Sequence, residues 1–236
     1  MSIQGLSVLA VVPARGGSKS IPRKNLQLVG GTSLVGRAAK VVSELSWIDR
    51  AILSTDDEEI ADEGRRHGLL VPFFRPEKLS GDKATSTDMW IDVWLKAEAF
   101  FSQRFDLSVL LEPTSPLRRA EDVERTVAEL IEGKHSAAAT VSPTPGHFTP
   151  HKTLTVNAAG KIGFYLSDGG KHSLRQSIPP YFHINGICYA VLRDTLITNK
   201  SIIENDCLAV VIERPVVNID DEFELRIANM LDADRP

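Results

Sequence analysis

The residues that follow the first apolar run carry the clearest chemistry of this chain of 236 residues. Residues 8–12 are continuously apolar, which predicts a buried strand. The next segment combines paired glycines with cations, hydroxyls and an amide: Ala14, Arg15, Gly16, Gly17, Ser18, Lys19, Arg23, Lys24 and Asn25. Paired glycines let the backbone approach a ligand, and the cations suit phosphate groups. Because open α/β sheets bind ligands at the carboxyl ends of strands, the segment predicts a nucleotide triphosphate site.

The two best-known phosphate loops do not match this spacing. A P-loop requires G-x-x-x-x-G-K-[ST], and a dinucleotide fingerprint requires G-x-G-x-x-G. Here the glycine pair 16–17 is followed by Ser18 and Lys19, and no further glycine comes before Gly30. The alternative interpretation is a basic surface loop that only turns.

Composition limits the classes of partner. A formal net charge of -4 argues against non-specific nucleic-acid binding, so the basic loop is a local feature. No run reaches the roughly 18 apolar residues of a membrane span, and no signal peptide precedes residue 8. Two cysteines and six scattered histidines form no zinc pattern. We therefore expect a cytoplasmic protein with no nucleic-acid or membrane partner.

Strand and helix patterns alternate along the first 140 residues. This alternation predicts a Rossmann-like, mostly parallel sheet with helices on both faces. Residues 142–183, rich in Pro, Gly and His, are expected to form a β-rich arm inserted into a single domain, 1–236. We expect strands at 8–12, 50–54, 71–74, 107–111, 137–141, 186–192 and 208–213, and helices at 33–45, 57–67, 85–101, 120–131 and 222–231. Within 85–101, the residues predicted to face the core are Trp90, Ile91, Trp94, Leu95 and Ala97.

The loop pattern A-R-G-G-S-K-x-I-P-x-K-N closely resembles the N-terminal signature of the CMP-sialic acid synthetases, or acylneuraminate cytidylyltransferases. One departure is Ser20, where that family has Gly. Further motifs follow in family order over essentially the whole chain. The resemblance implies a nucleotide-diphospho-sugar transferase-like fold, with the arm serving dimerisation, and therefore a homodimer.

The resemblance also implies roles for individual residues at the nucleotide. Arg15 and Lys24 would neutralise the triphosphate as catalytic cations, with Ser18 and Asn25 supporting the loop and the cytidine. Arg75 and Ser86 lie in a stretch similar to R-P-x-x-L-x-x-D-x-A-x-S and would contact the nucleotide or frame its base, although Ser86 could equally cap a helix. Asp56 would bind the ribose or orient a basic residue, or else simply begin the following helix. The expected nucleotide-binding residues are Ala14, Arg15, Gly16, Ser18, Lys24, Asn25, Asp56, Arg75 and Ser86.

The sugar side is implied by three other segments. Residues 112–118 are similar to the family's Q-P-T-S-P-L-R, but Glu112 replaces the Gln, so a carboxylate that only accepts hydrogen bonds stands where an amide would be. A helix-capping role is the alternative for Ser115. Lys152 and Arg175 match arm cations directed at the sugar carboxylate, one or both acting across the dimer interface. Asn185 would bind the sugar or the metal shell, next to Ile187 in place of a small Ala. The expected substrate-binding residues are Glu112, Thr114, Ser115, Lys152, Arg175 and Asn185.

Residues 218–225 resemble the family's metal-binding turn, D-I-D-T-x-x-D-L. Residues 218 and 220 share one face of an extended chain, and Mg²⁺ prefers oxygen ligands. Here Asn218 replaces the first carboxylate, so Asp220 is the expected direct ligand of Mg²⁺, for which Mn²⁺ may substitute. The alternative for Asp221 and Glu222 is an acidic first turn of a helix.

The resemblance implies a nucleotidyltransferase that joins CMP from CTP to the anomeric C2 oxygen of a nonulosonic acid and releases pyrophosphate. The general base stays open between a metal-bound hydroxide and Glu112. Two other functions stay open as well: a 3-deoxy-manno-octulosonate cytidylyltransferase, and a non-catalytic CTP-binding protein.

Overall fold

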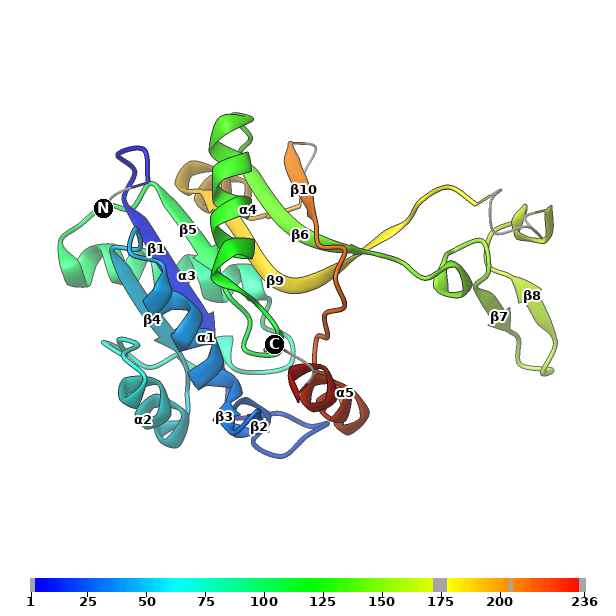
Figure 1. Ribbon diagram of the computed structural model, residues 1–236, viewed down its shortest axis with the longest axis horizontal. Helices are drawn as coiled ribbons and strands as arrows, with labels where there is room; N and C mark the ends of the chain where they lie inside the picture. Colours follow the sequence, from blue (N-terminus) through cyan, green and yellow to red (C-terminus); the bar gives the residue numbers. More distant parts are fainter. Residues whose placement is uncertain (1–2, 172–177, 204–205, 234–236) are drawn as a thin grey trace.

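A six-stranded sheet forms the centre of the computed structural model, which describes residues 3–171, 178–203 and 206–233. The strand order is β10-β6-β9-β5-β1-β4 (Figure 1). β9 is antiparallel to β5 and β6, whereas the other neighbouring pairs are parallel, which confirms the predicted mostly parallel sheet. The strands are β1 (Val8–Pro13), β4 (Arg50–Ser54), β5 (Leu107–Leu110), β6 (Ala137–Pro143), β9 (Phe182–Leu192) and β10 (Cys207–Val211).

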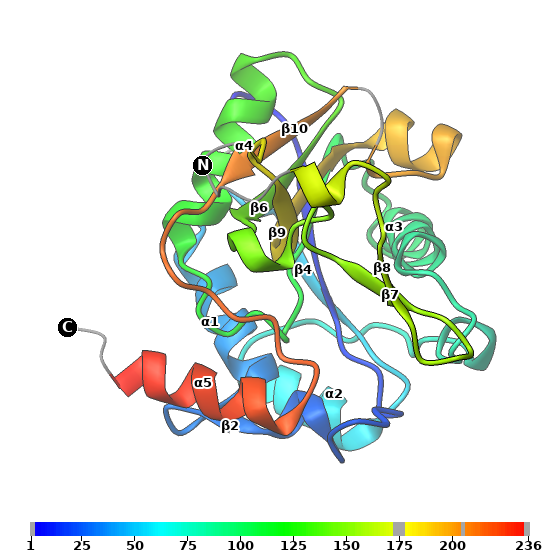
Figure 2. The ribbon, with the colours of Figure 1, turned by 90° about the vertical axis from the view of Figure 1, so that its right-hand side faces the viewer.

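Helices cover both faces of this sheet (Figure 2). Val8, Ala10 and Val12 of β1 belong to one core cluster, and Leu9 and Val11 belong to the other, because successive side chains of a strand point to opposite faces. α1 and α4 pack against the first cluster, and α3 packs against the second. The helices are α1 (Leu34–Glu44), α2 (Glu58–Arg66), α3 (Ser86–Phe101), α4 (Ala120–Glu132) and α5 (Glu222–Ala233).

The helix starts follow local capping chemistry, which is why sequence patterns located them well. Ser33 Oγ accepts a hydrogen bond from the Gly36 N–H at the start of α1. Asp57 does the same for Ile60 at the start of α2. A turn of 3-10 helix, η1 (Lys24–Leu26), and the two-stranded ribbon of β2 (Leu28–Val29) and β3 (Thr32–Ser33) connect β1 to α1.

The expected strand at 71–74 is wrong. Among the described residues around this segment, only Leu70 forms a β-bridge to the sheet, an isolated parallel one to Ile52 of β4. Pro72 and Pro76 lack the N–H groups that a strand pairing with β4 would need, and β4 remains the edge of the sheet. The segment instead leads into a short 3-10 helix, η2 (Glu77–Leu79), which lies beside the site described below.

Most of the predicted core face of α3 is confirmed. Trp90, Trp94 and Ala97 are fully buried, whereas Leu95 is 43% exposed and does not belong to the core. Helical spacing turns Leu95 away from the face that carries Trp90, Trp94 and Ala97, so hydrophobicity alone misassigned it.

Residues between β6 and β9 extend away from the sheet and carry the hairpin of β7 (Leu154–Val156) and β8 (Ile162–Phe164) (Figure 1). Their apolar side chains are exposed, with Val156 at 68% and Ile162 at 70%. The single-domain boundary and the dimerisation role of this arm stay predictions. None of the helices in the described part of the chain is long and apolar enough to cross a membrane.

Replacement of Trp94 tests the core on the α3 face. Trp94→Ala should lower the free energy of unfolding by about 3–5 kcal/mol, because it leaves a large cavity between α3 and the sheet. The neighbouring change Leu95→Ala should cost less than about 1 kcal/mol, because that side chain is already in solvent. Urea unfolding followed by circular dichroism measures both, and equal losses would contradict the assigned faces.

Candidate active site

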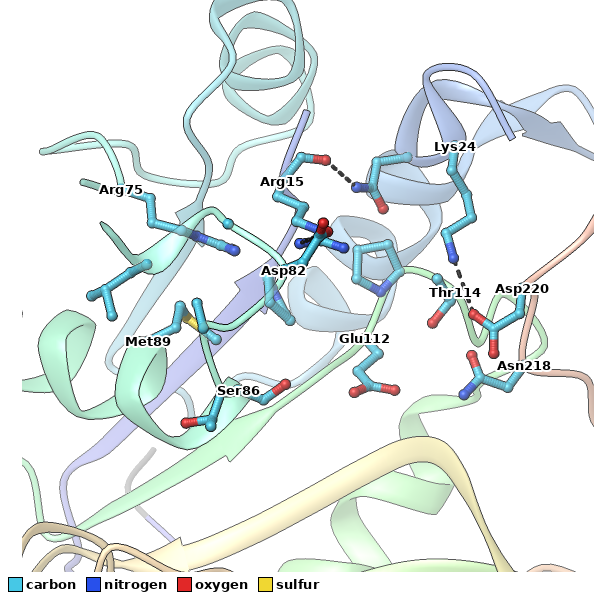
Figure 3. Close-up of a pocket in the computed structure, with 17 residues that line it drawn as sticks. Arg15, Lys24, Arg75, Asp82, Ser86, Met89, Glu112, Thr114, Asn218 and Asp220 are labelled. Atoms are coloured by element: carbon cyan, nitrogen blue, oxygen red, sulfur yellow. Dashed lines mark hydrogen bonds and ion pairs between the residues drawn. The ribbon is translucent and has the colours of Figure 1, made fainter. Parts of the chain in front are cut away.

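A cavity of about 440 Å³ opens at the carboxyl ends of β1 and β5 (Figure 3). It is lined by segments far apart in the sequence: the loop after β1, residues 75–89, the loop after β5, and residues 218–220. Nine residues singled out from the sequence line it: Arg15, Lys24, Asn25, Arg75, Ser86, Glu112, Thr114, Asn218 and Asp220.

The loop after β1 is held by hydrogen bonds to its own backbone. Asn25 is buried and donates from Nδ2 to the Arg15 carbonyl at 2.9 Å. The Gly16 N–H donates to Asp56 Oδ1 at 2.8 Å, so Asp56 positions the loop and is not among the residues that line the cavity. A Cβ at Gly16 would lie 2.9 Å from Asp57 Oδ2, which explains the glycine. Buried Ala14 continues the pairing of β1 by donating to the Ser54 carbonyl.

Three charged groups occupy the end of the cavity near η2. Arg15 lies 3.5 Å from Asp82, and it also donates to the Ser80 carbonyl. Arg75 donates to the hydroxyl and the carbonyl of Ser54. Burial lowers the pKa of Arg75 to about 10, an effect that Asp56 opposes and that Arg15 reinforces. Two guanidinium groups close enough to repel each other favour an anionic ligand between them.

Ser86 is available to a ligand because another residue caps α3. The Thr85 hydroxyl accepts the Asp88 N–H at 3.0 Å, so the capping role considered for Ser86 belongs to Thr85. Ser86 is the first residue of α3 and lines the cavity. Its hydroxyl lies where the positive end of the helix dipole favours negative charge.

The opposite end of the cavity gathers oxygen atoms. Lys24 Nζ donates to the Ile219 carbonyl at 3.0 Å and to Asp220 Oδ1 at 3.1 Å. The Ile219 N–H donates to the Thr114 carbonyl, which fixes residues 218–220 against the loop after β5. Asn218 Oδ1 is buried and accepts no hydrogen bond among the described residues, and Figure 3 shows it turned toward the Asp220 carboxylate.

Glu112 brings a second carboxylate to this end. Burial raises the pKa of Glu112; the nearby Asp220 raises it further, while Arg118 and Lys24 lower it. In the described part of the chain the Glu112 carboxylate forms no hydrogen bond or salt bridge. The site therefore holds a partly buried carboxylate without a paired cation.

Two predicted substrate-binding residues lie in the interior instead. The Ser115 hydroxyl donates to the Asn185 carbonyl at 2.8 Å, and both residues are buried. The Asn185 side chain bonds to Thr140, Ser142 and the Ile187 N–H, so its hydrogen-bonding capacity is used within the fold. Both roles stay predictions; in this structure the two side chains join β9 to β6 and to the loop after β5.

Two further predicted residues, Ser18 and Lys152, do not line the cavity. Ser18 belongs to the loop after β1 but does not line the cavity, and Lys152 lies on the arm. Arg175 lies outside the described residues.

Sequence reasoning missed the functions of Asp82 and Arg118. Asp82 pairs with both Arg15 and Lys19, and these cations lower its pKa. The position of Asp82 after Arg75 matches the motif given above, but the sequence does not show that Arg15 and Lys19 are its partners. Arg118 is buried and donates to the carbonyls of Ile187, Glu112 and Gly186, so it ties the loop after β5 to β9. Nothing in the local pattern indicates that this cation faces inward.

The fold and the cavity define an α/β nucleotide-binding protein, and similarities narrow the class. The family model described as cytidylyltransferase matches residues 9–157. Post-translational flagellin modification protein B of Campylobacter coli is 27% identical over 95% of this chain and 94% of its own length. CMP-N,N'-diacetyllegionaminic acid synthase of Legionella pneumophila is 30% identical over 83% of this chain and 82% of its own.

The solved structures agree on the fold. A CMP:2-keto-3-deoxy-manno-octonic acid synthetase in complex with CTP superposes with a TM-score of 0.70 at 18% identity, covering 96% of this chain and 98% of that one. The chain belongs to the cytidylyltransferase family. The fold and the family predicted from the loop and the other motifs are thus confirmed.

Because the Glu112 carboxylate has no paired cation, its replacement by a neutral amide should raise the stability of the fold, and the increase should depend on pH. Because the folded-state pKa of Glu112 is raised above its ordinary value of 4.5, ionisation destabilises the fold as the pH rises from that value through the raised pKa. Glu112→Gln cannot ionise, so in metal-free buffer it should be more stable than the wild type at about pH 7.5. The advantage should shrink toward about pH 4.5, where the glutamate becomes protonated.

Urea unfolding at both pH values, with a chelator present, measures this difference. Glu124→Gln, an exposed change on α4, is the matched control and should alter stability little at either pH. A Glu112→Gln variant that is less stable than the wild type at neutral pH would contradict the description of this carboxylate.

Proposed function

We propose that the protein is a CMP-nonulosonate synthase, which transfers CMP from CTP to the C2 hydroxyl of a nonulosonic acid and releases pyrophosphate. One observation carries the proposal: Arg15, Lys24 and Asp220 converge on one cavity at the carboxyl ends of β1 and β5. Family membership and the similarity to a CMP-N,N'-diacetyllegionaminic acid synthase support the same chemistry.

The residues of the cavity suit in-line phosphoryl transfer. Arg15 and the amides of the loop after β1 would hold the triphosphate, and Lys24 would offset negative charge that develops during transfer. The C2 hydroxyl oxygen would bond to the α-phosphorus while the bond from that phosphorus to the pyrophosphate oxygen breaks, and the hydroxyl proton would pass to solvent water or to the released pyrophosphate. Positioning of the two substrates supplies much of the acceleration. Arg75 and Ser86 would contact the nucleotide at the other end of the cavity.

We also propose a Mg²⁺ ion at residues 218–220. The donor set fits this hard cation: the Asp220 carboxylate faces the Asn218 oxygen, which is buried and lacks a hydrogen-bond donor within the described chain. Such an ion would neutralise phosphate charge when bound.

The exposed apolar hairpin supports a homodimer, which we propose as the working assembly. Val156, Ile162 and Phe164 are too exposed for a hairpin that stays in water, and burial against a second copy would remove this area from solvent. Lys152 would then approach the cavity of the partner subunit rather than that of its own chain.

A pyrophosphate-release assay tests the activity. CTP, UTP, ATP and GTP are each run with Mg²⁺ against a panel of nine-carbon nonulosonic acids and eight-carbon octulosonic acids. Release with CTP and a nonulosonic acid alone is expected and names the acceptor. Release with an octulosonic acid alone would shift the assignment to that class. CTP binding with no release across the panel would indicate a non-catalytic binding protein.

The loop after β1 supplies a matched pair of arginines. Arg15→Ala should lower kcat/KM by roughly 100-fold or more, because a cation that faces the cavity stabilises phosphate charge. Arg23 belongs to the same loop but pairs with Glu59 and does not line the cavity, so Arg23→Ala should keep activity within about threefold of the wild type. Steady-state kinetics with circular dichroism separates loss of function from loss of fold, and near-normal activity of Arg15→Ala would contradict the assigned site.

A further inference from the structure

Two departures from the family motifs meet in space. Glu112 stands where the motif has an amide, and Asn218 stands where it has a carboxylate. A Cβ built on Gly186 would lie 2.5 Å from Glu112 Oε2 and 3.1 Å from Asn218 Nδ2. The two side chains therefore meet in the space above this glycine, which has no side chain of its own. Compared with the family motifs, the carboxylate and the amide have thus exchanged positions at this end of the cavity.

We propose that Glu112 provides the second carboxylate of the divalent-cation site, in exchange for the one that Asn218 no longer provides. This inference rests on the proposed function and deepens it. The metal-binding group would consist of Glu112 from the loop after β5 together with Asn218 and Asp220 from the segment before α5 (Figure 3).

The carboxylate oxygens of Glu112 and Asp220 remain accessible to a bound cation. Lys24 is engaged on Asp220 and the Ile219 carbonyl. Arg118 donates to three main-chain carbonyls and forms no hydrogen bond or salt bridge with the Glu112 carboxylate among the described residues. Both cations lie near Glu112 and lower its pKa, but neither forms an ion pair with its carboxylate among the described residues. A divalent ion between Glu112 and Asp220 would offset the negative charge of both carboxylates.

Gly186 and Arg118 hold the two halves of this group together. Gly186 has a φ of 68°, a conformation that glycine adopts without strain, and any larger residue would collide with Glu112 Oε2 or with Ser115 Oγ. Arg118 fixes the Glu112 backbone to the same stretch of β9. These contacts fix the main chain at Glu112, and the glycine leaves space for its carboxylate.

A direct contact between Glu112 and the sugar is the competing role. The two roles differ in what they require: a sugar contact matters only when the acceptor is present, whereas a metal ligand matters with CTP and the cation alone. A binding measurement without acceptor therefore separates them.

The probe is Mn²⁺, followed by the loss of its free-ion EPR signal in the presence of protein and CTP, with a CTP-only titration subtracted. The wild type is compared with Glu112→Gln, Asn218→Asp and the double exchange Glu112→Gln/Asn218→Asp. Glu124→Gln, exposed on α4, is the matched control. CTP binding in EDTA, measured by calorimetry, and circular dichroism report separately on the nucleotide pocket and the fold.

Glu112→Gln should weaken Mn²⁺ binding by about tenfold or more, because one of two carboxylates is lost. The double exchange should return the affinity to within about threefold of the wild type, since it restores the carboxylate count from the opposite side. Asn218→Asp alone should bind at least as tightly as the wild type, and Glu124→Gln should match it.

Unchanged Mn²⁺ affinity in Glu112→Gln would overturn the inference and leave the proposed function intact. So would a weakened affinity that the double exchange fails to restore while CTP still binds. A wild type that does not bind CTP at all would instead overturn the proposed function, and this inference with it.

Discussion

The contact of Lys24 with residues 219 and 220 forms one wall of the cavity. Several distant parts of the structure are needed to form that contact. It joins the first loop of the chain to the last segment before α5. A small apolar cluster lies beneath it, in which Ile219 packs with Ile21 and with Ala228 of α5. The mostly buried ion pair of Arg37 and Asp232 fixes α5 against α1. Residues 218–220 therefore come to the cavity through the docking of a helix, and the local chain alone would not place them.

Like charges gather at each end of the cavity, and their repulsion is unfavourable for the folded protein without ligand. Arg15 and Arg75 repel each other at one end, and Glu112 and Asp220 repel each other at the other. Asp82 and Lys24 offset part of each repulsion, since they pair with Arg15 and with Asp220. The remaining self-repulsion costs stability. The proposed triphosphate at the first end and the proposed divalent ion at the second would relieve it.

Elements governed by local chemistry could be predicted from the sequence. The continuous apolar run of β1 and the start of α2 after Asp57 each depend on neighbouring residues. The errors arose where distant segments decide. Residues 71–74 have strand composition, but the edge strand β4 pairs only at Leu70. The sequence also does not show that Asn185 bonds to Thr140 and Ser142, because their strand, β6, lies beside β9 only in the folded sheet.

The positions 112 and 218 show the same limit at the level of chemistry. In the sequence each position departs separately from the family motif, and each departure taken alone suggests a loss of function. Position 112 has a carboxylate where the motif has an amide, and position 218 has an amide where the motif has a carboxylate. Their distance along the chain conceals that β9 brings them together at Gly186. Once they are placed side by side, the number of carboxylates at that end of the cavity equals the number in the family pattern. Two carboxylates at that end of the cavity agree with the proposed cation chemistry, because a protein without that chemistry would gain stability by losing the unpaired carboxylate.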